Sequence, residues 1–466
     1  MAAMRLAIHV FQKDARRLKW EAAAVIALTL VLAWLSGHAD DATRRPQYHN
    51  AAGALFSISM VAWCYLAIRV VQTDGLVGTD EDWMTRPVGR AQLAGGKALG
   101  LVSFLVVPVG LAVVVTLSLL GLEPLSRPGA LAWYVACFAL MLLAPAAAIG
   151  AVTRGLPAAA VSAIGVVAAV GLSESLLPAR VKYWSLLVWA PLAVVSLAAV
   201  VGGAAALWVQ YRSRRVWVAR GVVVGAVVLA AVGQAGLGWN EAFGLQKMIS
   251  GSAPPRPVKV EAGPREGDGY TVRLRGMEEG RRIRILRVDG VAESASGRQE
   301  LERAPKGFGR PEWEENVMVA GGGQAVRMSG VVWYEVLAPV GGSAVEYRQD
   351  EVLQGAPGRC RLHVAAMRQE GFEPMVRCAW AFRAPEEVTV AVRVGGWESR
   401  DATLSGTQAG SPFPAELGMP VSNGTSVLPR AEFRLEEAAE TGGKLVFRTW
   451  KVEGFYRQEF RIEGGL

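Results

Sequence analysis

The chain separates into two halves by the pattern of its apolar residues. Before about Trp239 long uncharged runs predominate, whereas beyond it charged residues recur every few positions. A membrane-spanning helix needs about 20 mostly apolar residues to cross roughly 30 Å of hydrocarbon. The runs at the first and fifth positions are the shortest, so the pattern allows six or seven spans. We expect them at 20–36, 52–71, 98–121, 129–151, 157–173, 184–208 and 217–237.

In the second half, apolar and polar residues alternate over short stretches. A period of two is typical of strands that bury one face and expose the other, as in antiparallel sheets. Short strands with glycine-rich turns between them favour one or two β-sandwiches. We expect strands at 270–275, 281–288, 330–338, 359–367, 375–382, 388–394, 431–436, 444–450 and 455–462.

The opening run "MRLAIHVFQKDARRLKW" predicts an amphipathic helix, because its apolar residues gather on one side of a helical wheel. Such a helix lies on the inner leaflet in contact with membrane lipid. The alternative is a solvated N-terminal turn whose positive charge only fixes the orientation of the chain. The apolar residues are Leu6, Val10, Phe11 and Leu18.

Together these patterns predict an α-helical polytopic membrane domain followed by an all-β, sandwich-like extracytoplasmic domain. The run "SGSAPPRPVKV", rich in proline, glycine and serine, marks the boundary between them. The expected parts are an interfacial helix over 1–19, a membrane domain over 20–240 with a cytoplasmic loop over 73–97, a linker over 241–258 and a β-rich domain over 259–466.

Composition supports a membrane protein, since 52% of the 466 residues are hydrophobic and 19% are charged. The net charge of +8 indicates basic loops rather than a nucleic-acid surface, because no basic patch is interleaved with aromatic residues. Lys and Arg concentrate on one side of the membrane if the N-terminus is cytoplasmic. With an odd number of spans, the β-rich domain is then on the periplasmic side of the inner membrane.

The central parts of the spans carry no acidic or histidine side chain. Proton- and sodium-driven transporters usually have such groups at mid-bilayer, so the pattern argues against an ion path. Arg69 lies near the cytoplasmic end of its span, where snorkelling to the lipid headgroups is favoured over a role in binding substrate.

A charged stretch that contains a tryptophan, "TDEDWMTRPVGRAQLAGGK", interrupts the apolar runs at 79–97. By the expected topology it lies in the cytoplasm between the second and third spans. Its acids favour the start of a short helix, its proline ends that helix, and residues 88–97 begin the next one. We expect a compact elbow in which Trp83 and Met84 form an apolar contact for a cytoplasmic partner.

The run from Glu81 to Lys97 resembles the first cytoplasmic loop of permease subunits of type-two ATP-binding-cassette (ABC) exporters, through its Trp-Met-Thr-Arg-Pro-Val-Gly-Arg core and the Leu and Lys that follow. The run "KDARRLKW" at 13–20 is similar to the amphipathic connecting helix of that family. The family usually has six spans, so the segment at 217–237 is a departure and forms an added seventh.

The resemblance implies a transporter subunit that is not itself an enzyme. A separate ABC ATPase subunit would hold ATP and Mg and contact the loop, and the permease would form a dimer with a second copy or a paralogue. The implied contact residues are Trp83, Met84, Thr85, Arg86, Pro87 and Arg90, with Glu81 and Asp82 as ion-pair partners.

The chain itself lacks a phosphate-binding loop. The nearest match is Gly95-Gly96-Lys97, but Ala91 occupies the position of the first glycine. Ala98 replaces the hydroxyl residue that would bind Mg.

The β-rich half offers few residues for chemistry. Cys360 and Cys378 fall in neighbouring predicted strands, where a disulfide is favoured over two reduced thiols if the compartment is oxidising. His363 lies in an alternating strand and is expected to be a surface or core residue rather than a base. No metal-binding spacing is present. Several arginines could receive an anionic ligand, although a solvated face is favoured: Arg273, Arg275, Arg282, Arg284 and Arg287.

A second interpretation is a non-transporting membrane scaffold or sensor that displays a β-sandwich binding domain. It accounts for the large external domain, but it gives no reason for the loop motif.

Overall fold

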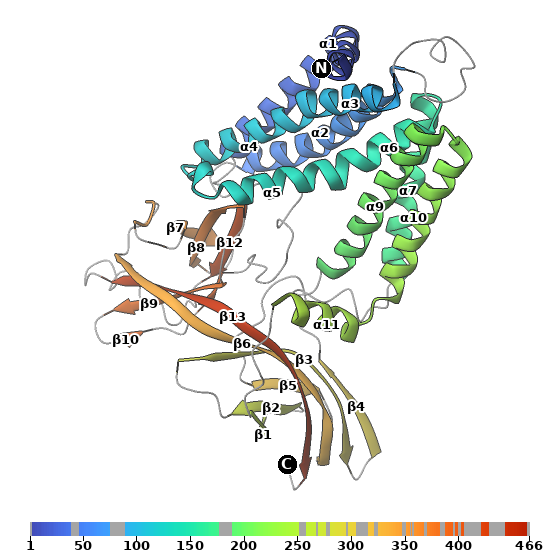
Figure 1. Ribbon diagram of the computed structural model, residues 1–466. Coiled ribbons are helices and arrows are strands. Elements are labelled where there is room, and N and C mark those ends of the chain that lie inside the picture. The colour runs from blue at the N-terminus through green and yellow to red at the C-terminus, as the bar shows by residue number, and fades with distance from the viewer. Residues whose placement is uncertain are drawn as a thin grey trace. The chain divides into compact units, whose positions relative to one another are not determined.

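The computed structural model divides the chain into a helical unit and a β unit (Figure 1). The described residues are 2–38, 46–74, 89–176, 189–250, 258–266, 269–275, 280–294, 297–303, 316–320, 325–346, 351–354, 356, 358–367, 371–382, 387–394, 397–398, 402–404, 421–427 and 443–463.

Nine α-helices form the described part of the helical unit. Six stretches are long and apolar enough to cross a membrane. The apolar stretch of α7, Leu156–Leu172, is shorter than these six. The expected span at 157–173 is therefore a helix, but it is not one of the six. The helices are α1 (Ala2–His38), α2 (Pro46–Gln72), α3 (Arg90–Leu101), α4 (Val107–Leu119), α5 (Pro128–Phe138), α6 (Ala144–Val152), α7 (Leu156–Leu176), α9 (Trp189–Ser213) and α10 (Val216–Gly236).

Two of the six spans contain a π-helical turn. Val102–Val106 joins α3 to α4, and Ala139–Leu143 joins α5 to α6. Each turn ends two residues before a proline, Pro108 or Pro145. Proline has no N–H to continue the α-helical ladder, so a local change of hydrogen-bond register keeps the span helical.

Helix α1 runs from Ala2 to His38 without a break. The predicted interfacial helix over 1–19 is thus continuous with the first apolar helix. Its apolar face packs inside the unit rather than only facing lipid: Val10 and Leu18 are buried, and a Cβ added at Gly96 of α3 would lie 2.7 Å from the Val10 side chain.

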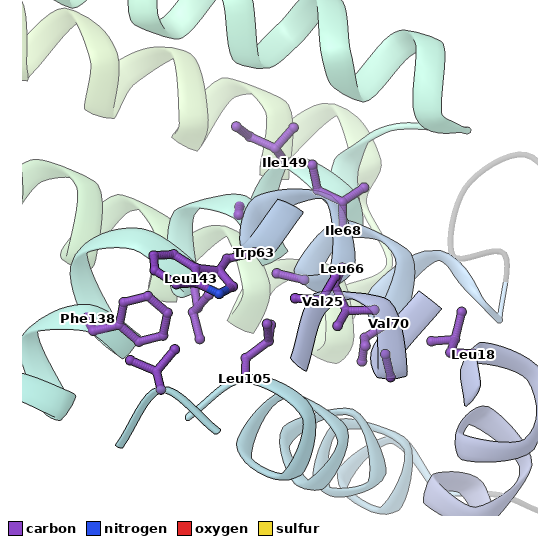
Figure 2. Packing of buried hydrophobic residues seen from close by; sticks show 14 of the residues in the cluster. Leu18, Val25, Trp63, Leu66, Ile68, Val70, Leu105, Phe138, Leu143 and Ile149 are labelled. Carbon is purple, nitrogen blue, oxygen red and sulfur yellow. The ribbon is translucent and has the colours of Figure 1, made fainter. Parts of the chain in front are cut away.

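The core of the helical unit is formed by residues from five spans or helices, as Figure 2 shows for Leu18, Leu66, Leu105 and others. Trp63 lies within it, with its ring centroid 5.1 Å from that of Phe138 and its Nε1 donating to Thr29 Oγ1 at 2.9 Å. The indole therefore buries its apolar surface while its polar atom is satisfied.

The described part of the β unit contains helix α11 and three sheets. The sheet orders are β1-β2-β5, then β10-β9-β13-β6-β3-β4 with β11 beside β9, and β12-β8-β7. The elements are α11 (Trp239–Ser250), β1 (Lys259–Glu266), β2 (Gly269–Arg275), β3 (Arg282–Ser294), β4 (Gly297–Arg303), β5 (Asn316–Ala320), β6 (Ala325–Glu346), β7 (Arg359–Met367), β8 (Gly371–Ala381), β9 (Glu387–Val394), β10 (Trp397–Glu398), β11 (Ala402–Thr403), β12 (Val421–Val427) and β13 (Lys444–Glu463).

The long strands β6 and β13 take part in two separate cores. Near the end of β13, Tyr456 and Phe460 pack against residues of β1, β2 and β3. Near its start, Leu445 and Phe447 pack against residues of β7, β8 and β9. The unit thus contains two packed sheet pairs that share one ribbon, in line with the expectation of one or two sandwiches.

Several boundaries differ from the expected ones. The strands expected at 444–450 and 455–462 are one strand, β13, because two local register shifts between Thr449 and Gly454 absorb the break in alternation. Most of the expected linker over 241–258 that is described is helical, since α11 extends to Ser250. The strand expected at 431–436 lies outside the described residues.

Helix α11 covers one face of the large sheet. Its Trp239 ring lies 6.3 Å from the ring of Trp333 on β6, and its Phe243 ring lies 6.1 Å from that of Phe455 on β13. The apolar side of α11 therefore belongs to the core of the β unit, which explains why these residues are not a free linker.

Candidate functional site

The proposed coupling loop is only partly described. Glu81, Asp82, Trp83, Met84, Thr85, Arg86 and Pro87 lie outside the described residues. The described flanks are Asp74, at the end of the segment after α2, and Gly89, the N-cap of α3.

The start of α3 is capped from within. Gln92 Oε1 accepts a hydrogen bond from the Gly89 N–H at 2.7 Å, and the Gly89 carbonyl oxygen accepts the N–H of Leu93 at 3.1 Å. Arg90, the first residue of α3, is exposed and donates through Nη1 to the carbonyl oxygen of Arg212 in α9. The second flank of the loop is thus fixed to a helix more than a hundred residues away in the sequence.

A buried group of charges joins the two flanks. Lys97 Nζ lies 2.7 Å from Asp14 Oδ2 and 2.5 Å from Asp74 Oδ2, and it also donates to Thr73 Oγ1. The exposed fractions of the Lys97 and Asp14 side chains are 3% and 1%. We call Lys13, Asp14, Asp74 and Lys97 the ionic cluster. It connects α1, α3 and Asp74, the second residue after the end of α2.

Further contacts hold the first flank. Lys13 pairs with Asp74 and lies 4.0 Å from Asp14 Oδ1, so the cluster balances two ammonium groups with two carboxylates. Arg17 Nη1 donates to the Thr73 carbonyl oxygen at 3.1 Å. The chain therefore leaves α2 at a point that α1 holds through both side-chain and backbone contacts.

Electrostatics favour the ionised form of Asp74. Burial by itself would raise the pKa of this carboxyl group, but the charge of Lys97 and hydrogen bonds from Lys13 and Lys97 outweigh it and hold the pKa below its ordinary value. A largely buried, ionised carboxylate between two ammonium groups constrains the position of the chain, because losing one partner leaves its charge uncompensated.

Two further hydrogen bonds connect helix ends on the same side of the helical unit as the ionic cluster. Gln72 Nε2 donates to Thr153 Oγ1 at 3.0 Å, which connects the ends of α2 and α6. Arg220 Nε donates to the Val152 carbonyl oxygen at 3.0 Å, which connects α6 to the start of α10. Together with the α3–α9 contact and the ionic cluster, they define what we call the loop end of the helical unit.

The sequence patterns missed most of this site. Lys97 was named only as the last residue of the loop motif and of the nearest match to a phosphate-binding loop, and Asp14 and Asp74 were not singled out. The sequence did contain evidence that Asp14 is buried. Asp14 lies four residues after Val10 and four before Leu18, which places it on the apolar face of α1. Arg69, which is expected to snorkel, pairs with Glu21 at 3.1 Å.

The β unit corrects another expectation. Arg284 and Arg287 do not form a solvated face: both are buried, Arg284 pairs with Glu335, and Arg287 lies 5.4 Å from the ring of Trp239. Arg282 lies 4.5 Å from the ring of Trp450. The side chains of Arg273 and Arg275 are outside the described residues.

Cys360 and Cys378 are register partners in β7 and β8, and a disulfide joins them. His363 lies in β7 opposite Met375. Among the described residues, no three His, Cys, Asp or Glu side chains are grouped closely enough to hold a metal ion.

Comparisons with known proteins give no relative: no family model, curated protein or solved structure matches this chain.

Proposed function

We propose that the chain is the membrane-spanning permease subunit of an ATP-driven exporter, and that residues 75–88 of the cytoplasmic loop expected over 73–97 bind a separate ATPase subunit. The observation that carries this proposal is the ionic cluster. Lys97 lies after the loop and Asp74 directly before it, and both pair in one buried site that also includes Asp14 of α1.

An ATPase without a membrane anchor can act on a transporter only by moving something that is attached to spanning helices. The loop meets this requirement, because its two flanks are fixed to α1, α2, α3 and α9 at the loop end. A displacement of the loop would therefore reach four helices at once. The energy for the change would come from the different contacts that the ATPase makes in its nucleotide states.

The transport path would lie between two copies of the permease. A cavity of about 90 Å³ is present between α6, α7, α9 and α10, and apolar residues such as Pro145, Val170 and Val227 line it. Ligand pockets in proteins usually have volumes of about 300 to 1,000 Å³, so this cavity is too small for a typical cargo. A dimer with a second copy or a paralogue supplies the missing space.

The loop end would face the cytoplasm. At the end of the helical unit opposite the loop end, α4 contacts α1, because Thr116 Oγ1 donates to the Ala33 carbonyl oxygen at 3.3 Å. If α7 crosses the membrane in addition to the six longer spans, α10 starts at the loop end and finishes at the opposite face. The β unit would then be periplasmic, where a disulfide such as Cys360–Cys378 is stable.

The test uses the full chain purified from its own membranes with the proteins that bind it, followed by measurement of ATP hydrolysis in the purified sample. The double variant Trp83→Ala/Arg86→Glu should lose the associated hydrolysis by about tenfold or more, because truncating a central Trp and reversing an Arg removes typical hot-spot contacts. The matched control is Trp20→Ala/Arg16→Glu, which changes two exposed residues of α1 in the same way.

Retained hydrolysis in the control and lost hydrolysis in the loop variant support the permease. Equal hydrolysis in both variants refutes the role of the loop. If no ATP hydrolysis is detected in the sample purified with the unaltered chain, the scaffold or sensor becomes the better interpretation, since it requires no ATPase subunit.

A further inference from the structure

The turn between α9 and α10 concentrates positive charge at the loop end. Helix α9 ends at Ser213 and α10 begins at Val216, so Arg214 and Arg215 form the whole connection. Arg212 precedes them on α9. Arg90 joins this group through its hydrogen bond to the Arg212 carbonyl oxygen. We call Arg90, Arg212, Arg214 and Arg215 the arginine group.

The backbone at Arg214 is in the left-handed region, with φ of 59°. The position directly after a helix commonly adopts this conformation, but glycine usually occupies it because a Cβ is unfavourable there. The Arg214 N–H still bonds to the Gln210 carbonyl oxygen at 3.1 Å, as expected for a helix end. A strained residue that retains a long side chain points to a use for that side chain.

The charges in the group are close enough to affect each other. Burial and the charge of Arg90 lower the pKa of the Arg214 guanidinium. The side chains of Arg90, Arg212 and Arg215 are exposed. An anion placed among them would offset the mutual repulsion, and the first-turn N–H groups of α10 add a further positive potential.

Two tryptophans place the turn at a membrane surface. Trp208 is 63% exposed with the Arg212 guanidinium 5.2 Å from its ring, and Trp217 is 81% exposed with the Arg220 guanidinium at the same distance. Exposed Trp beside Arg is typical of the headgroup level of a bilayer. The apolar surfaces of α9 and α10 continue away from the turn, with Leu197 66% exposed.

We infer that the arginine group binds the phosphate of an anionic phospholipid headgroup. Charge complementarity, the start of α10 and the flanking tryptophans all fit a lipid whose phosphate lies at the turn and whose acyl chains run along α9 and α10. An acidic surface of a protein partner would satisfy the arginines, but it would not explain two exposed tryptophans next to an apolar helix surface. This inference does not depend on the proposed transport function.

The experiment titrates the full chain in detergent with phosphatidylglycerol, phosphatidylcholine or inorganic phosphate. Bound lipid is counted by native mass spectrometry and the unfolding temperature is recorded. We expect phosphatidylglycerol to bind at least about tenfold more tightly than phosphatidylcholine. The variant Arg212→Gln/Arg215→Gln should weaken its binding by about 10- to 30-fold, since each arginine near an anionic surface contributes substantially.

Two further variants separate binding from folding. Arg457→Gln/Arg461→Gln removes two exposed arginines of β13 and should leave phosphatidylglycerol binding within about twofold, in contrast to the expected effect at the arginine group. Arg214→Gly should raise the unfolding temperature without lipid, because glycine adopts the left-handed backbone freely, and should still weaken lipid binding.

Any of four results overturns the inference. Phosphatidylcholine could bind as tightly as phosphatidylglycerol, or the β13 variant could weaken binding as much as the turn variant. Inorganic phosphate at millimolar concentration could raise the unfolding temperature as much as the lipid, which would identify a free anion as the ligand. Retention of an acidic protein by the unaltered chain but not by the turn variant, with lipid binding equal in both, would identify a protein partner and also refute it.

Discussion

Each unit of this molecule buries an ion pair, but the two pairs join different kinds of neighbour. In the β unit, Arg284 and Glu335 are 3% and 0% exposed and lie opposite each other on β3 and β6. Backbone hydrogen bonds already hold these strands in register over their length. In the helical unit, Lys97 and Asp14 are equally buried, but they lie on two helices that share no backbone ladder.

The difference indicates what each pair contributes. Strand pairing in the β unit would survive without its ion pair, because the ladder and the two cores set the position of each strand. In the helical unit, no backbone ladder connects α1, α3 and the exit of α2, so the ionic cluster, together with the Arg17 contact to the Thr73 carbonyl oxygen, determines where the chain leaves α2. The buried ion pair of the β unit thus joins strands that are already paired, whereas the ionic cluster of the helical unit connects elements that are otherwise separate.

The largest expected effect comes from Lys97→Met. This change leaves Asp14 and Asp74 without their shared ammonium group, and breaking a buried ion group in this way destabilises proteins by about 3 to 5 kcal/mol. The free energy of unfolding of the full chain in detergent measures it. Lys19→Met, at an exposed position of α1, is the control and should change stability by about 0.5 kcal/mol or less. A loss below about 1 kcal/mol for Lys97→Met would show that the cluster is not a structural link.

Removal of the disulfide should affect only the β unit. Cys360 and Cys378 are separated by 18 residues, and a crosslink over a loop of this size contributes about 2 to 4 kcal/mol. Cys360→Ser/Cys378→Ser should lower the unfolding transition of the β unit by this amount and leave that of the helical unit in place. Reduction of the unaltered chain should reproduce the shift. If reduction lowers the unfolding transition of the double variant by the same amount, loss of the disulfide is not the cause of the shift.

Acid should weaken the helical unit through Asp74. Its pKa is lowered in the fold, so the ionised form stabilises the folded state at neutral pH. This contribution is lost as the pH falls through the lowered pKa, below about pH 4. Asp74→Asn should cost about 1 to 3 kcal/mol at pH 7 and flatten the acid limb of the stability profile. Glu123→Gln, at an exposed position, should change neither. An unchanged acid limb in Asp74→Asn would contradict the assignment.

The smallest effect is expected when the whole pair in the β unit is replaced. Arg284→Met/Glu335→Leu exchanges two buried charges for apolar groups, and such replacements are often neutral or stabilising, within about 1 kcal/mol of the original. Arg284→Met alone should be far more destabilising, because Glu335 would remain charged and buried. If the double variant is as unstable as the single one, the pair is needed for strand register and the comparison between the two units fails.

The sequence predicted the two kinds of structure because each depends on local pattern. Long apolar runs identify spanning helices, and alternation identifies strands such as β7 and β9. Boundaries were less accurate where tertiary packing decides: α11 is helical because Trp239 and Phe243 pack on the sheet, and β13 stays continuous because β6 pairs with it on both sides of the bulges.

The site was harder to predict than the fold. The loop motif indicated where a partner would bind, but the ionic cluster joins residues 14, 74 and 97, whose meeting depends on how three helices pack. The sequence pattern along one helix does not show which charged residue of a neighbouring helix will lie next to it. Burial of Arg284 and Arg287 escaped prediction for the same reason, since alternation alone does not reveal that α11 covers that face of the sheet.

The central claim is that the loop over 75–88 contacts a nucleotide-hydrolysing subunit, and photo-crosslinking in native membranes tests it most directly. Trp83→benzoylphenylalanine places the reactive group on the loop, and Leu125→benzoylphenylalanine, at a 70% exposed position near the opposite end, is the control. We predict that mass spectrometry identifies a protein with a phosphate-binding loop crosslinked at position 83 and not at position 125. Crosslinks from position 83 only to proteins without a nucleotide site, or only to periplasmic proteins, would contradict the account.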